Sequence, residues 1–535
     1  MRLRTRILGL VTVALALMAL AACGAVGAND RSTVPANEKV KELDPYGGNL
    51  AAEGTPRRGG TLIIGNDREI VSFDPTVSNA NLASTAVYDM LLKMAPDGTV
   101  KPYLAQSMET PDNGLTWRMG LRPGVQFSDG TPVDADAVIV NTQRHIDKVA
   151  SPAHSFAEHI ASMRAVDPTT VEFTLKSPLG DFPVYFAQPF SATLGMLVSP
   201  TALKNGTDIG KQPVGTGPFV LESWQRDNRM RLTRNPHYWQ PGMPYLDGIE
   251  IRPLSDTETR YATMQNGDVD MINGGYNAEV VRAFANPNLK VYFGPGNSGT
   301  YFVFNFTHPP FDDLRMRKAV MEALDLDAAS ASLYMGQRVP TDSLFREGSP
   351  YHTQQASDIF PKQNLEDAKK LVQEYVADGG DPSFSYTTST SQVTQGEFVQ
   401  AQMAKAGMKV TPRYYDLAQF TTEVLQGGNF ELTSSVTPMD YPFPAVSRTF
   451  RSDGSANYGK YKNPRVDALI DDAAATTDPA KRTSDYQQIE RILNEDVVLG
   501  WMTSSYLSTI TKPDVRGIDR YITRDLFFAS IWLDR

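Results

Sequence analysis

Residues 395–414, QGEFVQAQMAKAGMKVTPRY, change within one residue from a helical pattern to a strand-like one. We expect a helix from about Gln395 to Ala406, ended by Gly407, because glycine suits the position that follows a helix. A short β-prone run, Met408 to Tyr414, comes next. A helix that leads through one glycine into a strand is typical of an α/β chain.

Other parts of the chain repeat this alternation. Asn364 and Asp367 form a helix-cap pattern ahead of apolar residues at helical spacing, and Asp478-Pro479 marks another helix start. We expect strands at Thr61–Gly65, Thr170–Leu175, Met230–Thr233, Ile249–Arg252, Leu289–Phe293, Tyr301–Phe306, Met408–Tyr414 and Phe430–Thr433. The predicted fold class is therefore mixed α/β, without a short internal repeat.

The only cysteine of the 535 residues, Cys23, follows an N-terminal apolar run. Residues 1–22 combine three arginines with an apolar stretch shorter than a membrane span, which is typical of an export signal. Leu20-Ala-Ala-Cys23 resembles the lipobox of bacterial lipoproteins, which implies a lipid on Cys23 and an anchor in the membrane. The alternative is an ordinary secretory signal. The polar residues 23–58 are predicted to be a flexible tether.

Composition restricts the class of protein. Without residues 1–22 the net charge of −10 becomes −13, because three arginines are lost, and an acidic chain does not fit nucleic-acid binding. With Cys23 lipidated no disulfide forms, so the core alone must stabilise the fold. The roughly 475 residues after the tether exceed the ~300 at which a single core stops growing, so we expect two or more lobes.

Motifs for catalysis and metal binding are absent or fail in context. Gly294-Pro-Gly-Asn-Ser-Gly299 fits GxGxxG, but the strand-like TYFVFNF follows it where a dinucleotide site needs a helix. We therefore interpret it as a turn between two strands. GxxxxGK[ST], GxSxG and HExxH do not occur, and the six histidines are scattered. We expect no catalytic residue, no metal and no cofactor, and a protein that binds rather than reacts.

Five separated segments, in order along the body, resemble the family 5 extracellular solute-binding proteins of ABC importers, the peptide/nickel type. They are Leu104–Met108 with its continuation through Trp117 to Val138, Gly215–Phe219 with Trp224 and Arg234–Trp239, Met264–Asp270, Asn305–Asp327, and Met439–Pro442 with Asn457-Tyr458 and Asn463-Pro464. The residues of these segments also predict local structure. LRPGVQFSDGTPV predicts a hairpin-like element with two tight turns. GTGPF predicts a structural turn, and RNPHYW predicts a segment that packs in the core.

The resemblance implies a two-lobed periplasmic-binding-protein-like fold of type II, with an extra subdomain and a hinge between the lobes. It places lobe I at residues 59–90, 215–300 and 505–535, the inserted subdomain at 91–214, and lobe II at 301–504. It also implies a monomer that captures a small solute or short peptide between the lobes and delivers it to the permease subunits of an ABC importer.

The resemblance further implies the candidate site. Peptide-binding members use an aspartate at the position of Asp440 to pair with the α-ammonium of the ligand; a turn-capping role is the alternative, because Phe443 stands where a second acidic residue is common. Residues Asn297, Ser298, Gly299 and Tyr301 lie where the chain re-enters the second lobe, and their backbone would pair with an extended peptide. Trp501, Trp224, Tyr441 and Phe73 are candidate aromatic walls, with burial in the core as the alternative.

The ligand class stays open at this point. A short peptide is the leading hypothesis, while oligosaccharides, opines, haem and metal complexes bind to other members of the family. An exported hydrolase on the same body would need a pair of carboxylates at catalytic separation, and a sensor or periplasmic chaperone would differ only in its partner.

Overall fold

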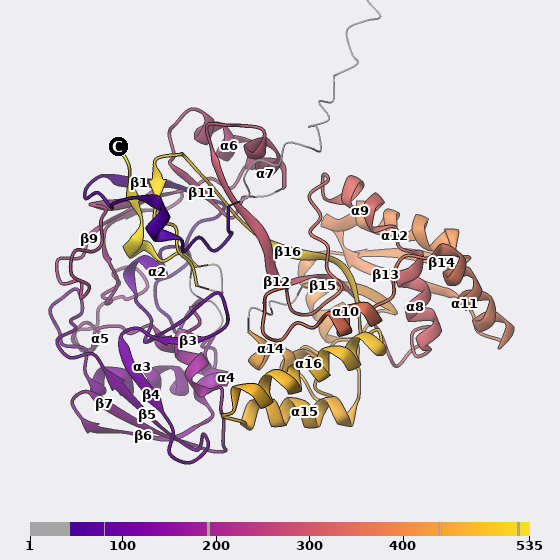
Figure 1. The fold of residues 1–535 in the computed structure, drawn as a ribbon, viewed down its shortest axis with the longest axis horizontal. Coiled ribbons are helices and arrows are strands. Elements are labelled where there is room, and N and C mark those ends of the chain that lie inside the picture. Colours follow the sequence, from indigo (N-terminus) through magenta and orange to yellow (C-terminus); the bar gives the residue numbers. More distant parts are fainter. Residues whose placement is uncertain are drawn as a thin grey trace, which may run out of the picture. The chain divides into compact units, whose positions relative to one another are not determined.

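The structure is a computed structural model that describes residues 43–79, 81–189, 193–275, 277–436, 439, 441–521 and 525–535. The predicted signal peptide and Cys23 lie outside these residues. Residues Glu42–Arg535 form one compact unit. Its main element is a mixed ten-stranded sheet in the order β14-β13-β15-β12-β16-β11-β1-β10-β9-β8 (Figure 1).

Two groups of strands make up this sheet, and two long strands join them. The first half holds β1 (Thr61–Asn66), β8 (Phe219–Gln225), β9 (Arg229–Arg234), β10 (Gly248–Pro253) and β11 (Met271–Asn273). The second half holds β13 (Ser383–Ser389), β14 (Lys409–Tyr415) and β15 (Leu432–Val436). The joining strands are β12 (Lys290–Phe304) and β16 (Leu499–Thr511), which are antiparallel to each other. The chain thus passes between the two halves along neighbouring strands.

A separate four-stranded subdomain is inserted after β1. Its antiparallel sheet has the order β4-β5-β7-β6, with β4 (Ala105–Glu109), β5 (Thr116–Leu121), β6 (Ile160–Asp167) and β7 (Thr170–Leu175). Its helices are α3 (Ala135–Asp147), α4 (His154–Ala157), η2 (Phe182–Phe186), η3 (Thr193–Gly195) and α5 (Pro200–Lys204). The hairpin β2 (Leu92–Met94) and β3 (Val100–Pro102) leads into it.

Helices accompany both halves of the sheet. The first half has η1 (Leu50–Glu53), α2 (Ser84–Val87), α6 (Thr257–Gln265), α7 (Asn277–Phe284) and η6 (Phe528–Ser530), with the small hairpin β17 (Val515–Arg516) and β18 (Trp532–Leu533). The second half has α8 (Leu314–Ala323), α9 (Leu326–Leu333), α10 (Gln354–Ile359), α11 (Leu365–Ala377), η4 (Thr390–Gln392), α12 (Val393–Lys405), α13 (Leu417–Gln419), the π-helix η5 (Phe420–Gln426), α14 (Pro442–Phe450), α15 (Pro464–Ala475) and α16 (Pro479–Glu495). Among the residues described, no helix is both long and apolar enough to cross a membrane.

The hydrophobic cores do not coincide with the two halves of the large sheet and the four-stranded subdomain. One cluster lies mainly in the first half, where it includes Leu62, Ile64 and Ile251, and it extends to Ala202 of α5 in the subdomain. A larger cluster is shared by the four-stranded subdomain and the second half, and it includes Phe173 as well as Tyr486. The subdomain therefore packs directly against the second half.

Most predicted elements are present. Asn364 caps α11 by accepting a hydrogen bond from the backbone N–H of Asp367, and Asp478 caps α16. Gly407 has φ +89°, as its place after α12 requires. In the LRPGVQFSDGTPV element, Gly124 and Gly130 have positive φ and Phe127 is fully buried, which confirms the two turns and the docked apolar residues.

Two expectations about strands need correction. The GxGxxG stretch is not a turn between two strands, because β12 runs through it as one strand, with its register against β16 shifted between Pro295 and Gly299. A bulge absorbs the extra residues, and glycine tolerates the bulge. The strand β13 was not predicted at all, because its sequence SFSYTTS is mostly small and polar although nearly all of it is buried.

Residues that precede β1 already contact the body. The backbone N–H of Leu43 donates to the carbonyl of Val291 at 3.3 Å, and Leu43 forms a parallel bridge with Tyr292 of β12. Tyr46 is buried, and the guanidinium of Arg346 lies 5.0 Å from the centre of its ring. These contacts fall within the stretch 23–58 that the sequence predicts to be a tether.

Candidate functional site

One of the two joining strands, β12, is paired along only part of its outer edge. β15 pairs with the outer edge of β12 only from Thr300 to Phe304, and Leu43 bridges it at Tyr292. In the described part of the chain, no strand pairs with that edge from Gly294 to Gly299. This open stretch of β12, residues 294–299, lies where the two halves of the sheet meet (Figure 1).

Glycine is required in the open stretch for steric reasons. A Cβ on Gly299 would lie 2.2 Å from the carbonyl oxygen of Thr503 on β16, so the two backbones meet more closely than a side chain allows. The hydroxyl of Ser504 donates to the carbonyl of Gly296 at 3.0 Å. Asn297 and Ser298 belong to β12 by their backbone. Close contacts with β16 therefore hold the backbone of the bulge.

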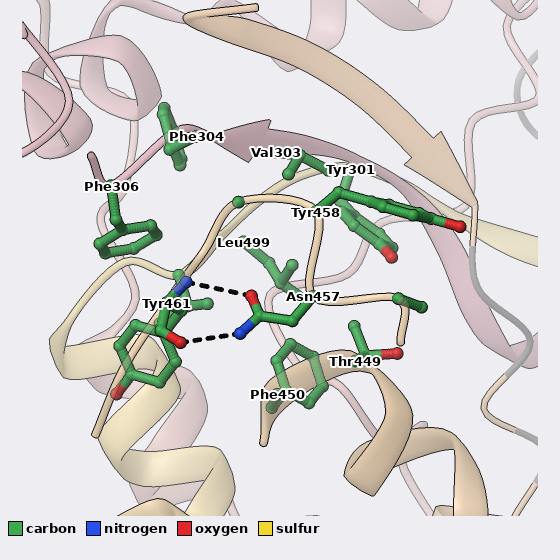
Figure 2. A pocket seen from close by; sticks show the side chains of 13 residues that line it. Tyr301, Val303, Phe304, Phe306, Thr449, Phe450, Asn457, Tyr458, Tyr461 and Leu499 are labelled. Atoms are coloured by element: carbon green, nitrogen blue, oxygen red, sulfur yellow. Dashed lines mark hydrogen bonds between the residues drawn. The ribbon is translucent and has the colours of Figure 1, made fainter. Parts of the chain in front are cut away.

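Tyr301 and Trp501 lie next to the open stretch but are buried. Each is 2% exposed, and their rings meet edge to face with centroids 5.5 Å apart. Beside Tyr301 is a cavity of about 20 Å³, room for about one water molecule. Figure 2 shows Asn457 among the residues that line it, with hydrogen bonds to the backbone of Tyr461, which are 2.8 and 3.0 Å long. This cavity is too small for a solute, and Asn457, a motif residue, has a structural role here.

Tyr441 is the described neighbour of Asp440, which itself lies outside the described residues. Tyr441 is 5% exposed, and its hydroxyl donates to the carboxylate of Asp181 at 3.0 Å. Arg482 of α16 forms an ion pair with the same oxygen at 3.0 Å. Burial raises the pKa of Asp181 to about 6 although Arg482 and Tyr441 lower it. Sequence reasoning missed Asp181 and Arg482, because they come from segments 301 residues apart and carry no motif.

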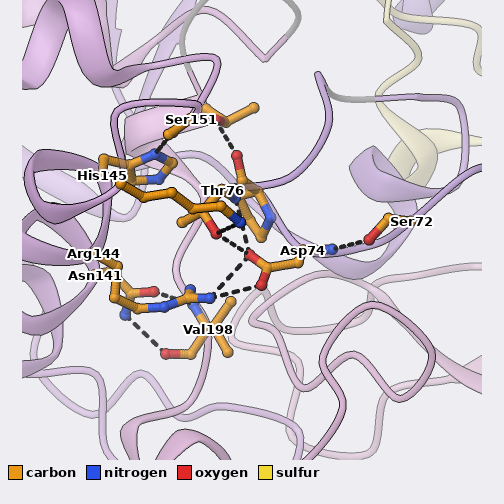
Figure 3. Close-up of polar contacts among 11 residues, drawn as sticks. Ser72, Asp74, Thr76, Asn141, Arg144, His145, Ser151 and Val198 are labelled. Atoms are coloured by element: carbon orange, nitrogen blue, oxygen red, sulfur yellow. Dashed lines mark hydrogen bonds and ion pairs between the residues drawn. The ribbon is translucent and has the colours of Figure 1, made fainter.

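Phe73 lies in a turn that is fixed to the four-stranded subdomain. It is 1% exposed and meets Trp224 edge to face at 5.4 Å. The next residue, Asp74, accepts two hydrogen bonds from Arg144 of α3, at 2.8 and 2.9 Å (Figure 3). Burial raises the pKa of Asp74, but hydrogen bonds from Thr76 and the charge of Arg144 hold it below the ordinary value. The turn is thus held by an ion pair.

A hollow of about 460 Å³, open to solvent, adjoins this turn. The charged side chains that line it already have partners: Arg144 with Asp74, and Lys211 with Asp208 at 3.0 Å. His145, on the same helix, is buried, and burial lowers its pKa to about 4, so it is neutral. Among the described residues no group of three or more His, Cys, Asp and Glu side chains is arranged to hold a metal ion.

The remaining motifs hold the scaffold together. Gly217 approaches the backbone of Val87 so closely that a Cβ would lie 2.4 Å from its carbonyl carbon. Trp239 of RNPHYW donates its indole N–H to Asp89 at 2.7 Å. Asp270 accepts from the backbone N–H of Ile63 at 3.0 Å and pairs with Lys512. These motif residues therefore connect distant segments of the first half.

Comparison with known proteins gives consistent matches. The sequence model of the bacterial extracellular solute-binding proteins, family 5 middle region, matches residues 99–458. The glutathione-binding protein GsiB of Shigella dysenteriae serotype 1 is 28% identical over 486 residues, which cover 86% of this chain and 91% of the relative.

Two solved structures show the same fold. NikA from Brucella suis, in complex with Fe(III)-EDTA, has a TM-score of 0.76 at 24% identity and covers 89% of this chain and 100% of its own. The oligopeptide-binding protein AppA from Bacillus subtilis, in complex with a nonapeptide, has a TM-score of 0.71 at 23% identity and covers 90% and 100%. The predicted two-lobed periplasmic-binding-protein fold is confirmed.

Proposed function

Because the chain belongs to the bacterial extracellular solute-binding proteins of family 5, we propose that it captures a short peptide and delivers it to the permease of an ABC importer. Members of this family are binding proteins, so the chain is not an enzyme. The class of solute and the residues that bind it are the subject of the proposal.

The open stretch of β12 carries the proposal. An extended peptide presents N–H and C=O groups along its edges, and residues 294–299, which lack only the N–H of Pro295, present an unpaired edge of the same kind at the junction of the two halves. Main-chain pairing of this kind recognises peptides without regard to side chains. Sugars and metal complexes lack the regular row of N–H donors and C=O acceptors that a peptide backbone has.

Asp440 supplies the second contact. It stands four residues after Val436, and Val436 is paired with Thr300 at the end of the open stretch. A carboxylate at this position would hold the α-ammonium of a peptide by a charge-assisted hydrogen bond. Asn297, Ser298 and Gly299 would then supply the pairing strand. Tyr301 is already paired with Ser435 of β15 and Trp501 of β16, so it would join Tyr441, Trp501 and Phe73, buried in the structure, as the walls behind that strand.

A second candidate is glutathione, the ligand for which the 28% identical relative GsiB is named. Glutathione carries a free α-ammonium and a peptide bond, so the same two contacts would receive it. The two candidates differ in ligand length and in the γ-linkage, which a panel of ligands distinguishes.

The experiment is native mass spectrometry of the chain from residue 24 onward, purified without refolding, followed by calorimetry with tri-alanine, N-acetyl-tri-alanine and glutathione. We expect tri-alanine to bind at least tenfold more tightly than its acetylated form, because acetylation removes the ammonium. Asp440→Asn should remove that difference, whereas Asp358→Asn, an exposed aspartate on α10, should keep it. Equal affinity of wild-type protein for both peptides would contradict the proposed role of Asp440.

The proposal also covers location and domains. Residues 1–22 would be removed and Cys23 lipidated, which would keep a monomeric receptor at the outer face of the membrane. Lobe I would comprise 59–90, 215–300 and 505–535, the inserted subdomain 91–214, and lobe II 301–504. The pairing of β1 with β10 and β11, and of β11 with the end of β16, supports this division.

A further inference from the structure

The segment between β7 and η2 of the four-stranded subdomain reaches the second half of the protein at Gly180 and Asp181. The backbone N–H of Gly180 donates to the carbonyl of Ala474 at 2.9 Å. A Cβ on Gly180 would lie 1.8 Å from the carbonyl oxygen of Thr476, so the two backbones touch. Close to this contact, the rings of Tyr185 and Phe443 stack with centroids 5.9 Å apart.

Asp181 is a buried charge inside this contact. Its side chain is 0% exposed. One carboxylate oxygen, Oδ1, accepts the hydrogen bond from the Tyr441 hydroxyl and also forms the ion pair with the Arg482 guanidinium. The other oxygen, Oδ2, has no hydrogen-bond partner among the described residues. Both partners belong to the second half, since Tyr441 precedes α14 and Arg482 lies on α16. Separating the subdomain from the second half would return all three groups to water.

We propose that Asp181 controls how tightly the four-stranded subdomain docks on the second half, and that it thereby positions Tyr441. The positioning part of this inference rests on the function proposed above. Asp181 does not touch the solute; it acts through Tyr441. The contact closes only in the docked arrangement, so solute capture and docking strengthen each other.

The groups that face Asp181 determine its response to pH. They are Arg482 and Tyr486 of α16, Tyr441, Tyr351 of the loop before α10, and Tyr185 of η2. Burial raises the pKa of the four tyrosines, to about 12 for Tyr351 and well above 10 for the others, so all are neutral near pH 7. Farther out, His159 stacks on Tyr185, and burial lowers the pKa of His159 below 6.5. Glu158 also faces Tyr185.

The sign of the effect follows from burial. In the docked state the pKa of Asp181 is about 6, and in water it is 3.8, so the docked state binds the proton more tightly. Docking therefore strengthens as the pH falls below 6. From these two values, the docking equilibrium rises about tenfold between pH 7.5 and pH 5.0.

Spin-label distances test this without any solute. The chain from residue 24 has no cysteine, so labels at Val166→Cys on β6 and Val376→Cys on α11, both 46% exposed, report on the subdomain and the second half. We expect the docked fraction to increase from pH 7.5 to 5.0. Asp181→Asn, which imitates the protonated side chain, should dock equally at both pH values. His159→Gln should behave like wild type.

Three further variants sharpen the result. Asp181→Ala removes the acceptor of Tyr441 and should reduce docking at both pH values, and Gly180→Ala should do the same by steric contact with Thr476. Arg482→Gln leaves the carboxylate without its counter-charge, so its pH dependence should be steeper than that of wild type. Distances that are unchanged by pH and by Asp181→Ala would overturn the inference.

Binding of tri-alanine gives the second readout. In the protein without labels, its dissociation should be about tenfold slower at pH 5.0 than at pH 7.5, and Asp181→Asn should remove this change. A pH effect that persists in Asp181→Asn would overturn the positioning role. If tri-alanine does not bind wild-type protein, the proposed function fails by itself, while the spin-label distances still decide whether Asp181 controls docking.

Discussion

Asp270→Asn tests whether the third motif, MQNGDVD, holds the first half of the protein together. The Asp270 side chain is 3% exposed and binds Lys512 at 2.9 Å, Arg535 at 2.9 Å and the backbone N–H of Ile63 at 3.0 Å. These contacts join β1, the end of β16 and the C-terminus. Asparagine keeps the size and one acceptor oxygen but loses both ion pairs.

The magnitude follows from the exposure of the partners. A hydrogen bond to a charged group contributes about 1.5–3 kcal/mol. Two are lost here, but Lys512 and Arg535 are 23% and 46% exposed and regain water, so we expect a net loss of about 2–3 kcal/mol. With an unfolding entropy of about 2.1 cal/mol/K per residue, the thermal midpoint of this large chain should fall by about 2–3 °C.

Differential scanning calorimetry at pH 7 measures this shift, with Asp268→Asn as the matched control, because Asp268 is exposed two residues earlier. Burial raises the pKa of Asp270, but Arg535, Ile63 and Lys512 bring it below 3.8. Its contribution is therefore present above pH 4 and is lost as the pH falls through the folded pKa. Equal midpoints for Asp270→Asn and Asp268→Asn at pH 7 would refute the reasoning.

Three other changes have defined outcomes. Gly299→Ala should destabilise the fold by about 1–3 kcal/mol in urea unfolding, because a Cβ cannot fit 2.2 Å from the Thr503 carbonyl; an unchanged midpoint would contradict the bulge geometry. Trp239→Phe removes a hydrogen bond to Asp89, whose pKa burial raises to about 7. The loss of unfolding free energy should therefore be greater at pH 8.5, where Asp89 is ionised, than at pH 6. An equal loss at both pH values would contradict the role of this hydrogen bond. Cys23→Ala should release the protein from membranes in cell fractionation; a variant that stays in the membrane fraction would disprove the lipid anchor.

Local patterns predicted individual elements well, because their causes are local. Capping by Asn364 and Asp478 and the glycine after α12 act over a few residues, and the corresponding helices are present. The strand β13 was missed because burial on both faces, rather than side-chain type, keeps SFSYTTS extended. The bulge in β12 was mistaken for a turn because its partner β16 is about 200 residues away and leaves no local trace.

The candidate site could be predicted only in part for the same reason. The resemblance to the family predicts the segments near residues 297–301 and 440, and their role in binding stays a prediction. The contact of Asp181 with Tyr441 and Arg482 brings together segments 260 residues apart or more, and no spacing pattern encodes it. Burial of Trp501 and Tyr301 against each other likewise depends on how β12 and β16 pair.

The course of β12 and β16 makes the second half one continuous piece of chain. Every helix from α8 to α16 and every strand from β13 to β15 lies between these two strands in the sequence, while the first half is assembled from several pieces. Two junctions, one in β12 and one in β16, are therefore sufficient to exchange the whole second half with that of a relative. Such chimeras would show which half determines the choice of solute, provided that the residues facing Gly180 and Asp181 are transferred together.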